Sequence, residues 1–205
     1  MTSVRNVSRR WALAAGLLMP FGVSPAPAQF FRPLERVPEP TVQDVDPGQD
    51  QGSADAVPYE FRRQPVFHRS QETAGTLIVD TSERFLFLIQ SPTNAMRYGI
   101  GVGRDGFTWT GILKITRKAE WPDWTPPPEM IERQPYLPRW MAGGPGNPLG
   151  ARAMYLGSTV YRIHGTNAPE TIGHAVSSGC FRLVNDDVAD LYDRVKVGAK
   201  VVVRH

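Results

Sequence analysis

The sequence of 205 residues contains only one cysteine, Cys180. Exported proteins that keep cysteine usually keep it in pairs as disulfides, and a lone thiol excludes any disulfide within the chain. A lipoprotein anchor is also excluded, because it requires a cysteine at an N-terminal processing site. Cys180 is therefore either an inert core residue or a reactive thiol.

The N-terminus lacks an apolar run long enough to cross a bilayer, which takes about 20 residues. The apolar run over residues 14–23 follows Arg9-Arg10 and precedes Ala26-Pro27-Ala28, which has the small-x-small pattern of a cleavage site. We therefore expect a cleaved signal peptide over residues 1–28, export to the periplasm and no permanent membrane anchor. The paired arginines resemble a twin-arginine signal, and a general secretory signal fits the same pattern.

A lasting excess of positive charge is also missing. The formal net charge is +3, but loss of residues 1–28 would remove three arginines and no acidic residue, leaving 20 basic and 20 acidic groups. Nucleic-acid binding needs a basic face, so nucleic acid is excluded as an expected partner.

Composition divides the rest of the chain into two parts. Residues 29–58 are rich in proline and poor in aliphatic residues, which predicts a disordered spacer. From Tyr59 onward, short β-branched and aromatic runs alternate with turn residues and predict one mainly β domain over residues 59–205. The predicted strands cover residues 75–80, 84–89, 96–102, 109–116, 153–156, 159–164 and 200–204.

Two segments of this domain depart from the strand pattern. A helix is predicted to start with Asn185 as its cap and to place Val188, Leu191 and Val195 on one face, with Gly198 after its end. Residues 120–150 combine many prolines and glycines with large aromatics, including Trp140. We interpret this stretch as a lid or cleft wall, or equally as a surface loop over packed aromatics.

The residue types required for thiol catalysis are found in two short motifs, His164-Gly165-Thr166-Asn167 and Ser177-Ser178-Gly179-Cys180-Phe181-Arg182. A thiol is only a few per cent ionised at pH 7, so it needs a base or a positive charge nearby to attack a carbonyl. We expect His164 to accept the thiol proton and return it to a leaving amine.

The small residues before the cysteine suggest how a transition state could be held. Ser178 and Gly179 allow close approach of a substrate, and the N–H groups of Gly179 and Cys180 are the expected donors to an oxyanion. Arg182 would point to the same side as Cys180 in an extended segment and could bind a substrate carboxylate.

Two other interpretations use the same residues. His164, His174 and Cys180 are all zinc ligand types, but their spacing matches no common zinc signature and no fourth ligand is near. We therefore expect no metal and no cofactor. A buried inert Cys180 remains the other alternative.

The two motifs resemble those of the YkuD-like L,D-transpeptidase family, in which a His-Gly-Thr-Asn segment precedes Ser-x-Gly-Cys-x-Arg. The segment Gly146-Asn147-Pro148-Leu149-Gly150-Ala151-Arg152 resembles a further stretch of that family, and the likeness covers residues 76–203. Ser178 stands where many members carry histidine, and Phe181 replaces a more usual Ile or Val.

The resemblance implies a β-sandwich-like catalytic domain, with one helix after the cysteine, that acts on peptidoglycan stem peptides. Cys180 would attack the third residue of a stem tetrapeptide, release D-alanine and pass the acyl group to an amine of another stem peptide or of an outer-membrane protein. Gly165, Ser178 and Gly179 would orient the reacting groups, and Arg182, Thr166, Asn167 and Trp140 would bind substrate. An L,D-carboxypeptidase using the same site, and a non-catalytic wall-binding module, remain alternatives.

Overall fold

The structure is a computed structural model that describes residues 57–205. The predicted signal peptide and nearly all of the predicted spacer lie outside the described residues. Within them, no helix has the length and apolar character to cross a membrane. Val57 was assigned to the spacer, but it is buried against Ile172 and Val184. The folded region therefore includes at least the last residues of that segment.

The described chain is built mainly of strands, which confirms the predicted class. The strands are β1 (Gln64–Phe67), β2 (Leu77–Asp80), β3 (Phe85–Ile89), β4 (Asn94–Gly99), β5 (Val102–Gly103), β6 (Gly111–Glu120), β7 (Arg152–Leu156), β8 (Arg162–His164), β9 (Ala175–Ser177), β10 (Phe181–Arg182) and β11 (Lys200–Arg204). The helices are α1 (Pro128–Arg133) and α2 (Asn185–Arg194), with short 3-10 helices at Tyr59–Phe61 and Pro169–Thr171.

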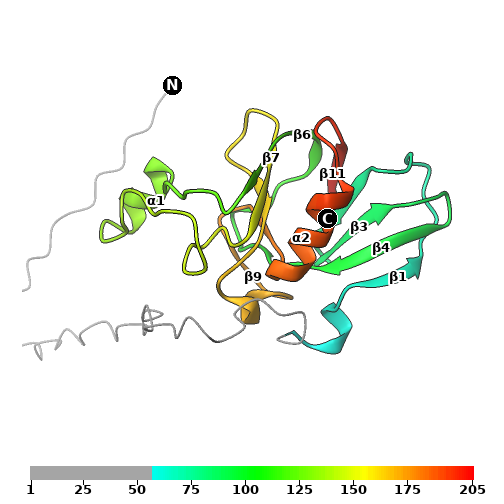
Figure 1. Cartoon of the computed structure of the whole chain (residues 1–205), viewed down its shortest axis with the longest axis horizontal. Helices are drawn as coiled ribbons and strands as arrows, with labels where there is room; N and C mark the ends of the chain where they lie inside the picture. The colour runs from blue at the N-terminus through cyan, green and yellow to red at the C-terminus, as the bar shows by residue number, and fades with distance from the viewer. Residues whose placement is uncertain (1–56) are drawn as a thin grey trace, which may run out of the picture. The chain divides into compact units, whose positions relative to one another are not determined.

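Nine strands are hydrogen-bonded in the order β1, β4, β3, β2, β11, β6, β7, β8 and β10, while β5 pairs with β9 (Figure 1). Strand β6 belongs to both halves of this arrangement. Its first residues pair with β11, and its residues from Ile115 onward pair with β7, with an irregularity between Ile115 and Arg117. A bulge of this kind bends a strand, so β6 lets one continuous ladder contribute to two packed layers.

The predicted hairpin is confirmed, because β2 and β3 pair antiparallel with Leu77 opposite Leu88. The predicted C-terminal strand is confirmed as β11, which pairs parallel with β2 and antiparallel with β6. Val201 and Val203 are buried and Val202 is only partly exposed, as expected of a central strand.

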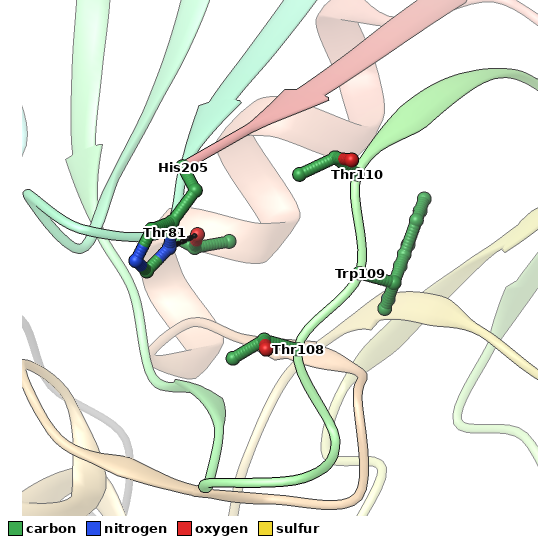
Figure 2. Close-up of a pocket in the computed structure, with 5 residues that line it drawn as sticks. All are labelled: Thr81, Thr108, Trp109, Thr110 and His205. Atoms are coloured by element: carbon green, nitrogen blue, oxygen red, sulfur yellow. Dashed lines mark hydrogen bonds between the residues drawn. The ribbon is translucent and has the colours of Figure 1, made fainter.

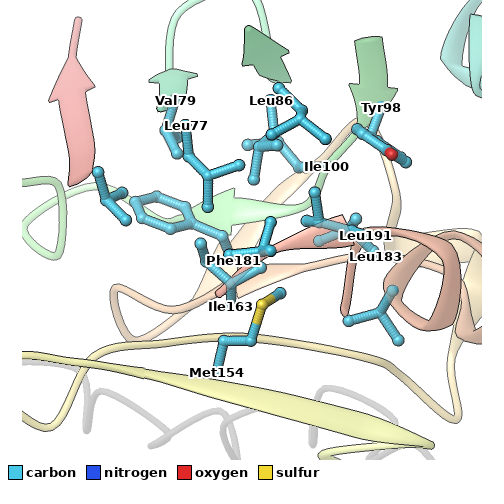
Figure 3. Close-up of a cluster of buried hydrophobic side chains, with 14 of the residues drawn as sticks. Leu77, Val79, Leu86, Tyr98, Ile100, Met154, Ile163, Phe181, Leu183 and Leu191 are labelled. Atoms are coloured by element: carbon cyan, nitrogen blue, oxygen red, sulfur yellow. The ribbon is translucent and has the colours of Figure 1, made fainter. Parts of the chain in front are cut away.

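The core lies between the two halves of the ladder and α2. Leu77, Leu86 and Tyr98 come from the first half, and they meet Ile163 and Phe181 from the second (Figure 3). Helix α2 contributes its predicted apolar face to the same cluster. It also contacts β7 and is tied to β4 by a hydrogen bond from the Tyr98 hydroxyl to Asp190 at 2.7 Å.

The predicted start of α2 is corrected in one respect. Val184 is the cap residue, and Asn185 is the first residue of the helix. The Asn185 side chain does not cap the helix, because its Oδ1 accepts the backbone N–H of Ala151 at 2.9 Å. This contact places Oδ1 against Gly150 and Gly165, where a Cβ on either glycine would lie 2.3 Å from it. Asn185 therefore joins three segments near the end of β8.

The segment 120–150 is held by its own hydrogen bonds. It contains α1, a two-way backbone bridge between Trp124 and Met141, and the Asn147 amide, which donates to Met141 and Ala142. Asn147 is buried, and its Oδ1 accepts the backbone N–H of Leu149 at 2.8 Å. The internal bonds explain how a stretch this rich in proline and glycine keeps a defined path.

Candidate active site

The two predicted catalytic residues are brought together by a parallel strand pair. Strand β8 ends at His164, and Cys180 immediately precedes β10, in which Arg182 is the register partner of His164. Side chains alternate along a strand, so Arg162 and His164 share one face of β8, and Cys180 and Arg182 share the same face of the neighbouring segment. Cys180 and His164 therefore occupy opposite corners of a four-residue block.

The other face of the same strands is buried. Ile163 and Phe181 are register partners whose side chains belong to the core cluster and are at most 1% exposed. This burial fixes which side of the strands the block faces, because a shift of one residue would turn the apolar side chains outward. The core thus holds the thiol and the imidazole on one side of the sheet.

His164 is held in one tautomer by the backbone. Its Nδ1 lies 2.6 Å from the carbonyl oxygen of Gly165, and a carbonyl can only accept, so Nδ1 carries the hydrogen. The other ring nitrogen, Nε2, is then an acceptor that can take a proton. Gly165 thus supplies the orienting group that a carboxylate provides in other catalytic sites, and its own N–H donates to Arg152 O at 2.9 Å.

Burial favours the neutral forms of both His164 and Cys180. Burial, aided by the positive charges of Arg182 and Arg162, lowers the pKa of His164 to about 3. Burial raises the pKa of the Cys180 thiol above its ordinary value, against opposing effects of a backbone hydrogen bond from Arg162 and of the two guanidinium charges. The arrangement therefore favours a neutral thiol and a neutral imidazole.

The residue that carries the thiol is nevertheless not fully buried. Cys180 is partly exposed, and its Sγ lies 3.8 Å from the carbonyl oxygen of Val160, to which it donates weakly. The alternative of a sealed, inert core cysteine therefore does not fit this residue.

Ser177 holds the turn that presents the cysteine. Its hydroxyl donates to Cys180 O at 2.6 Å and accepts the Gly179 N–H at 3.1 Å. The Gly179 N–H is thus already engaged, which leaves the Cys180 N–H as the remaining expected oxyanion donor. Sequence reasoning gave Ser177 no role, although its position at the start of the motif was a usable signal.

Trp109 and Tyr161 pack against the turn that precedes Cys180. The Trp109 Nε1–H donates to Gly179 O at 2.8 Å, and its ring stacks on Tyr161 with centroids 4.5 Å apart. Gly179 has φ of +102°, and a Cβ there would lie 2.6 Å from the Tyr161 ring. Neither aromatic was identified from sequence, because only the fold brings Trp109 to a residue 70 positions away.

A cavity of about 190 Å³ lies close to this support but does not include the thiol or imidazole. Thr81, Thr108, Trp109, Thr110 and His205 line it, and the Thr81 hydroxyl is 2.9 Å from His205 Nδ1. Figure 2 shows Thr108 and Thr110 directed to one side of the backbone and the Trp109 ring to the other. The segment therefore separates the cavity from the cysteine turn.

Thr166 and Asn167 each make a hydrogen bond within the chain. Thr166 is 1% exposed, and its hydroxyl accepts the Ala168 N–H at 3.0 Å, so it stabilises the local turn. Asn167 is exposed and donates to Gly146 O at 3.1 Å, which ties the loop after β8 to the segment before β7. The predicted substrate contacts of Thr166 and Asn167 stay predictions.

Ser178 is partly exposed, and Trp140 is exposed. The Ser178 hydroxyl lies 3.5 Å from Arg104 Nη1, at the limit of a hydrogen bond. Trp140 is 57% exposed, and within residues 57–205 no hydrogen bond or ring contact joins it to the other predicted site residues. Its predicted substrate contact stays a prediction.

Arg182 contributes charge beside the imidazole. Its Nε is buried without a hydrogen-bond partner, and burial lowers the pKa of the guanidinium.

In the part of the chain that the structure describes, no group of three His, Cys, Asp or Glu side chains is placed to hold a metal ion. His174, one of the three residues of the zinc alternative, is exposed on the loop before β9.

Comparison with known proteins agrees with this geometry. The model of the YkuD L,D-transpeptidase catalytic domain matches residues 74–203. The Escherichia coli K12 protein named "Probable L,D-transpeptidase ErfK/SrfK" is 39% identical over 136 residues, which are 62% of this chain and 43% of that protein. "Probable L,D-transpeptidase YbiS" of the same strain is 38% identical over 135 residues, 61% of this chain and 43% of that protein. The match thus spans less than half the length of these relatives.

Solved structures share the fold. L,D-transpeptidase 3 from Mycobacterium tuberculosis has a TM-score of 0.53 at 15% identity, covering 64% of this chain and 61% of its own. A Brucella melitensis structure named a probable carnitine operon oxidoreductase is 48% identical over 74% of this chain and 100% of its own, and its TM-score of 0.49 is too low to bear on function. The family model covers more than half of the chain, including His164 and Cys180, so this protein belongs to the YkuD L,D-transpeptidase catalytic domain family.

Proposed function

We propose that this protein is a cysteine-dependent peptidoglycan L,D-transpeptidase that works in the periplasm after removal of residues 1–28. The observation that carries the proposal is the placement of a partly exposed thiol and a tautomer-fixed imidazole at opposite corners of one block, with His164 Nδ1 committed to Gly165 O. Thiol acyl transfer needs this pairing of nucleophile and base.

In the acylation half-reaction, His164 Nε2 takes the thiol proton while Cys180 Sγ attacks the carbonyl of the third residue of a stem tetrapeptide. The new S–C bond forms, and the oxyanion is stabilised by the Cys180 N–H. The peptide C–N bond then breaks, and the imidazolium gives its proton to the amine of the departing D-alanine. The product is a thioester on Cys180.

In the second half-reaction, an amine of an acceptor attacks the thioester carbonyl. An N–C bond forms, the S–C bond breaks, and a proton from the amine passes through His164 back to the sulfur. The acceptor is a neighbouring stem peptide or an outer-membrane protein. Attack by water at the same step would give the L,D-carboxypeptidase reaction.

The test is a donor tetrapeptide incubated with an amine acceptor and the purified chain, with D-alanine release and cross-linked product measured. Cys180→Ser is expected to keep the fold and lose turnover by at least about 10³-fold, because the alcohol is a far weaker nucleophile under an imidazole base tuned for a thiol. Ser158→Ala, in the exposed turn between β7 and β8, is the control and is expected to keep full activity.

Two results would contradict the proposal. The first is cross-linking by the Cys180→Ser variant above a trace. The second is an unchanged mass of the protein after incubation with a carbapenem. A nucleophilic Cys180 is expected to react with the carbapenem and to add the mass of one covalent adduct. An unmodified protein that still binds peptidoglycan would favour the wall-binding module.

A further inference from the structure

Arg162 and Arg182 occupy the other two corners of the four-residue block that contains Cys180 and His164. Arg162 lies beside the sulfur on β8, and Arg182 lies beside the imidazole on β10. Both guanidinium charges act on the thiol and on the imidazole. Neighbouring strands are about 4.8 Å apart and residues two apart along a strand about 6.6 Å apart, so the two arginines flank the thiol–imidazole diagonal at close range.

The cationic row continues outward from Arg162. Tyr155 on β7 is the register partner of Arg162, and Arg117 on β6 is the register partner of Tyr155. The Arg117 guanidinium carbon lies 3.5 Å from the centre of the Tyr155 ring, and that of Arg162 lies 5.3 Å from it. Stacking on an aromatic ring orients a guanidinium without consuming its N–H donors.

Arg117, Arg162 and Arg182 form no ion pair among the described residues, although the charge of Glu170 acts on Arg182 from a longer distance. Arg152 on β7, by contrast, pairs with Glu120 at 3.3 Å. The Nε atoms of Arg162 and Arg182 are buried without a hydrogen-bond partner. Clustered cations repel each other, and planar guanidinium forks fit carboxylates bidentately, so an anionic ligand would satisfy both the charge and the donors.

We propose that Arg162, with Arg117 stacked behind Tyr155, binds a carboxylate on the acyl part of the donor. His164 must reach the leaving amine, and its register partner is Arg182, so the departing residue and its terminal carboxylate belong on the Arg182 side. Arg162 is then left for the part that stays on the sulfur. The substrate class is a peptide with one carboxylate on each side of the scissile bond.

The assignment of Arg162 to a donor carboxylate rests on the proposed function. The attraction of an anion to the Cys180 thiol does not, so this attraction can be measured without a peptidoglycan substrate. Iodoacetate and iodoacetamide both alkylate the thiolate with loss of iodide, and only the first carries a carboxylate. Both rate constants are proportional to the fraction of Cys180 that is thiolate, so the ratio of the iodoacetate rate constant to the iodoacetamide rate constant does not depend on this fraction. We expect this ratio to fall about fivefold or more in Arg162→Gln and to stay near the wild-type value in Arg152→Gln, which removes one charge from the same sheet.

The second test uses donor tetrapeptides in which the carboxylates of the acyl part are free or converted one at a time to primary amides. For the wild type, one of these amides is expected to raise the KM for D-alanine release about tenfold while kcat changes less than about threefold. Arg162→Gln should show the high KM both with the free donor and with that amidated donor. Arg162→Lys should recover part of the preference for the free donor, because lysine keeps the positive charge but lacks the planar guanidinium that binds a carboxylate through two hydrogen bonds.

The outcomes separate the two proposals. An unchanged iodoacetate preference in Arg162→Gln, or full discrimination between free and amidated donors in that variant, overturns the assignment of Arg162. Absence of D-alanine release by the wild type from every donor overturns the proposed function, and the alkylation ratio then still decides whether Arg162 attracts a carboxylate to the thiol.

Discussion

Trp109 donates its indole N–H to the carbonyl oxygen of Gly179 across 2.8 Å and stacks on Tyr161 at 4.5 Å. Gly179 is the residue before the cysteine, so this bond fixes the turn that aims the thiol. The hydrogen bond and the stacking come from separate parts of the indole, and they can be separated by substitution.

Trp109→Phe is expected to keep ring stacking and lose the hydrogen bond. We predict a loss of about 1 kcal/mol in the free energy of unfolding and a fall of about tenfold or more in kcat, because the turn before Cys180 becomes less fixed. Denaturant unfolding and steady-state kinetics check both values. Tyr59→Phe, at an exposed position without a predicted role in the site, should change the free energy of unfolding by less than about 0.5 kcal/mol and kcat by less than about twofold, and a similar kcat loss there would remove the specific role of Trp109.

Gly179→Ala tests the close packing of the same turn. The substitution places a Cβ 2.6 Å from the Tyr161 ring at a φ of +102°, so it adds a clash to the backbone strain. Gly106→Ala is the matched control, because Gly106 has φ of +80° and a Cβ added there would have no neighbouring atom within 4 Å. We expect Gly179→Ala to be less stable than the control by about 1 to 3 kcal/mol in thermal or denaturant unfolding. Equal losses would show that only strain matters.

The protonation state of the catalytic pair predicts the pH dependence of thiol alkylation. The thiol pKa is raised by burial and the imidazole pKa is lowered to about 3, so both groups are neutral from about pH 5 to 8. The rate with iodoacetamide should rise about tenfold per pH unit through this range, without a plateau, and its midpoint should lie above that of the unfolded chain. A plateau near neutral pH would indicate a thiolate–imidazolium pair and contradict the neutral state.

Asp187 in α2 predicts a pH dependence of stability. Burial raises its pKa to about 6, against the lowering effect of Arg63, and its Oδ1 lies 3.7 Å from Arg63 Nε. A carboxyl with a raised folded pKa contributes stability below its unfolded pKa of 3.8, and this contribution is lost as the pH rises through about 6.

Asp187→Asn removes that ionisation. At pH 7.5 the variant is expected to be more stable than the wild type by about 1 to 3 kcal/mol, with a much smaller difference at pH 4. Urea unfolding at the two pH values measures this. Asp193→Asn, on the exposed side of the same helix, should shift stability by less than about 0.5 kcal/mol at both. A destabilised Asp187→Asn variant at pH 7.5 would show that the contact with Arg63 outweighs burial.

Local pattern was sufficient for much of the fold. The hairpin of β2 and β3 was predictable because its strands are adjacent in sequence and rich in β-branched and aromatic residues. The helix after Cys180 was predictable from the spacing of Val188 and Leu191, but its cap was not. Asn185 had the sequence of a cap and instead binds Ala151, a partner that only folding brings within reach.

The candidate site divides in the same way. His164 and Cys180 were identified from their motifs, whereas Ser177, Trp109 and Arg162 gained roles only from the turn, the stacking and the strand register. Thr166 was assigned to substrate from its place in a motif, and its burial could not be known before the loop after β8 was placed.

The sequence by itself determined that the chain has one thiol, a histidine that could accept its proton, and a strand that ends at this histidine, since these depend on residue type and local periodicity. Tertiary structure alone decided that β8 and β10 run side by side, that a backbone carbonyl orients the imidazole, and that burial holds thiol and imidazole neutral. Register and desolvation arise from residues far apart in the chain, and even the contact between the adjacent His164 and Gly165 requires backbone and side-chain conformations that the surrounding fold sets.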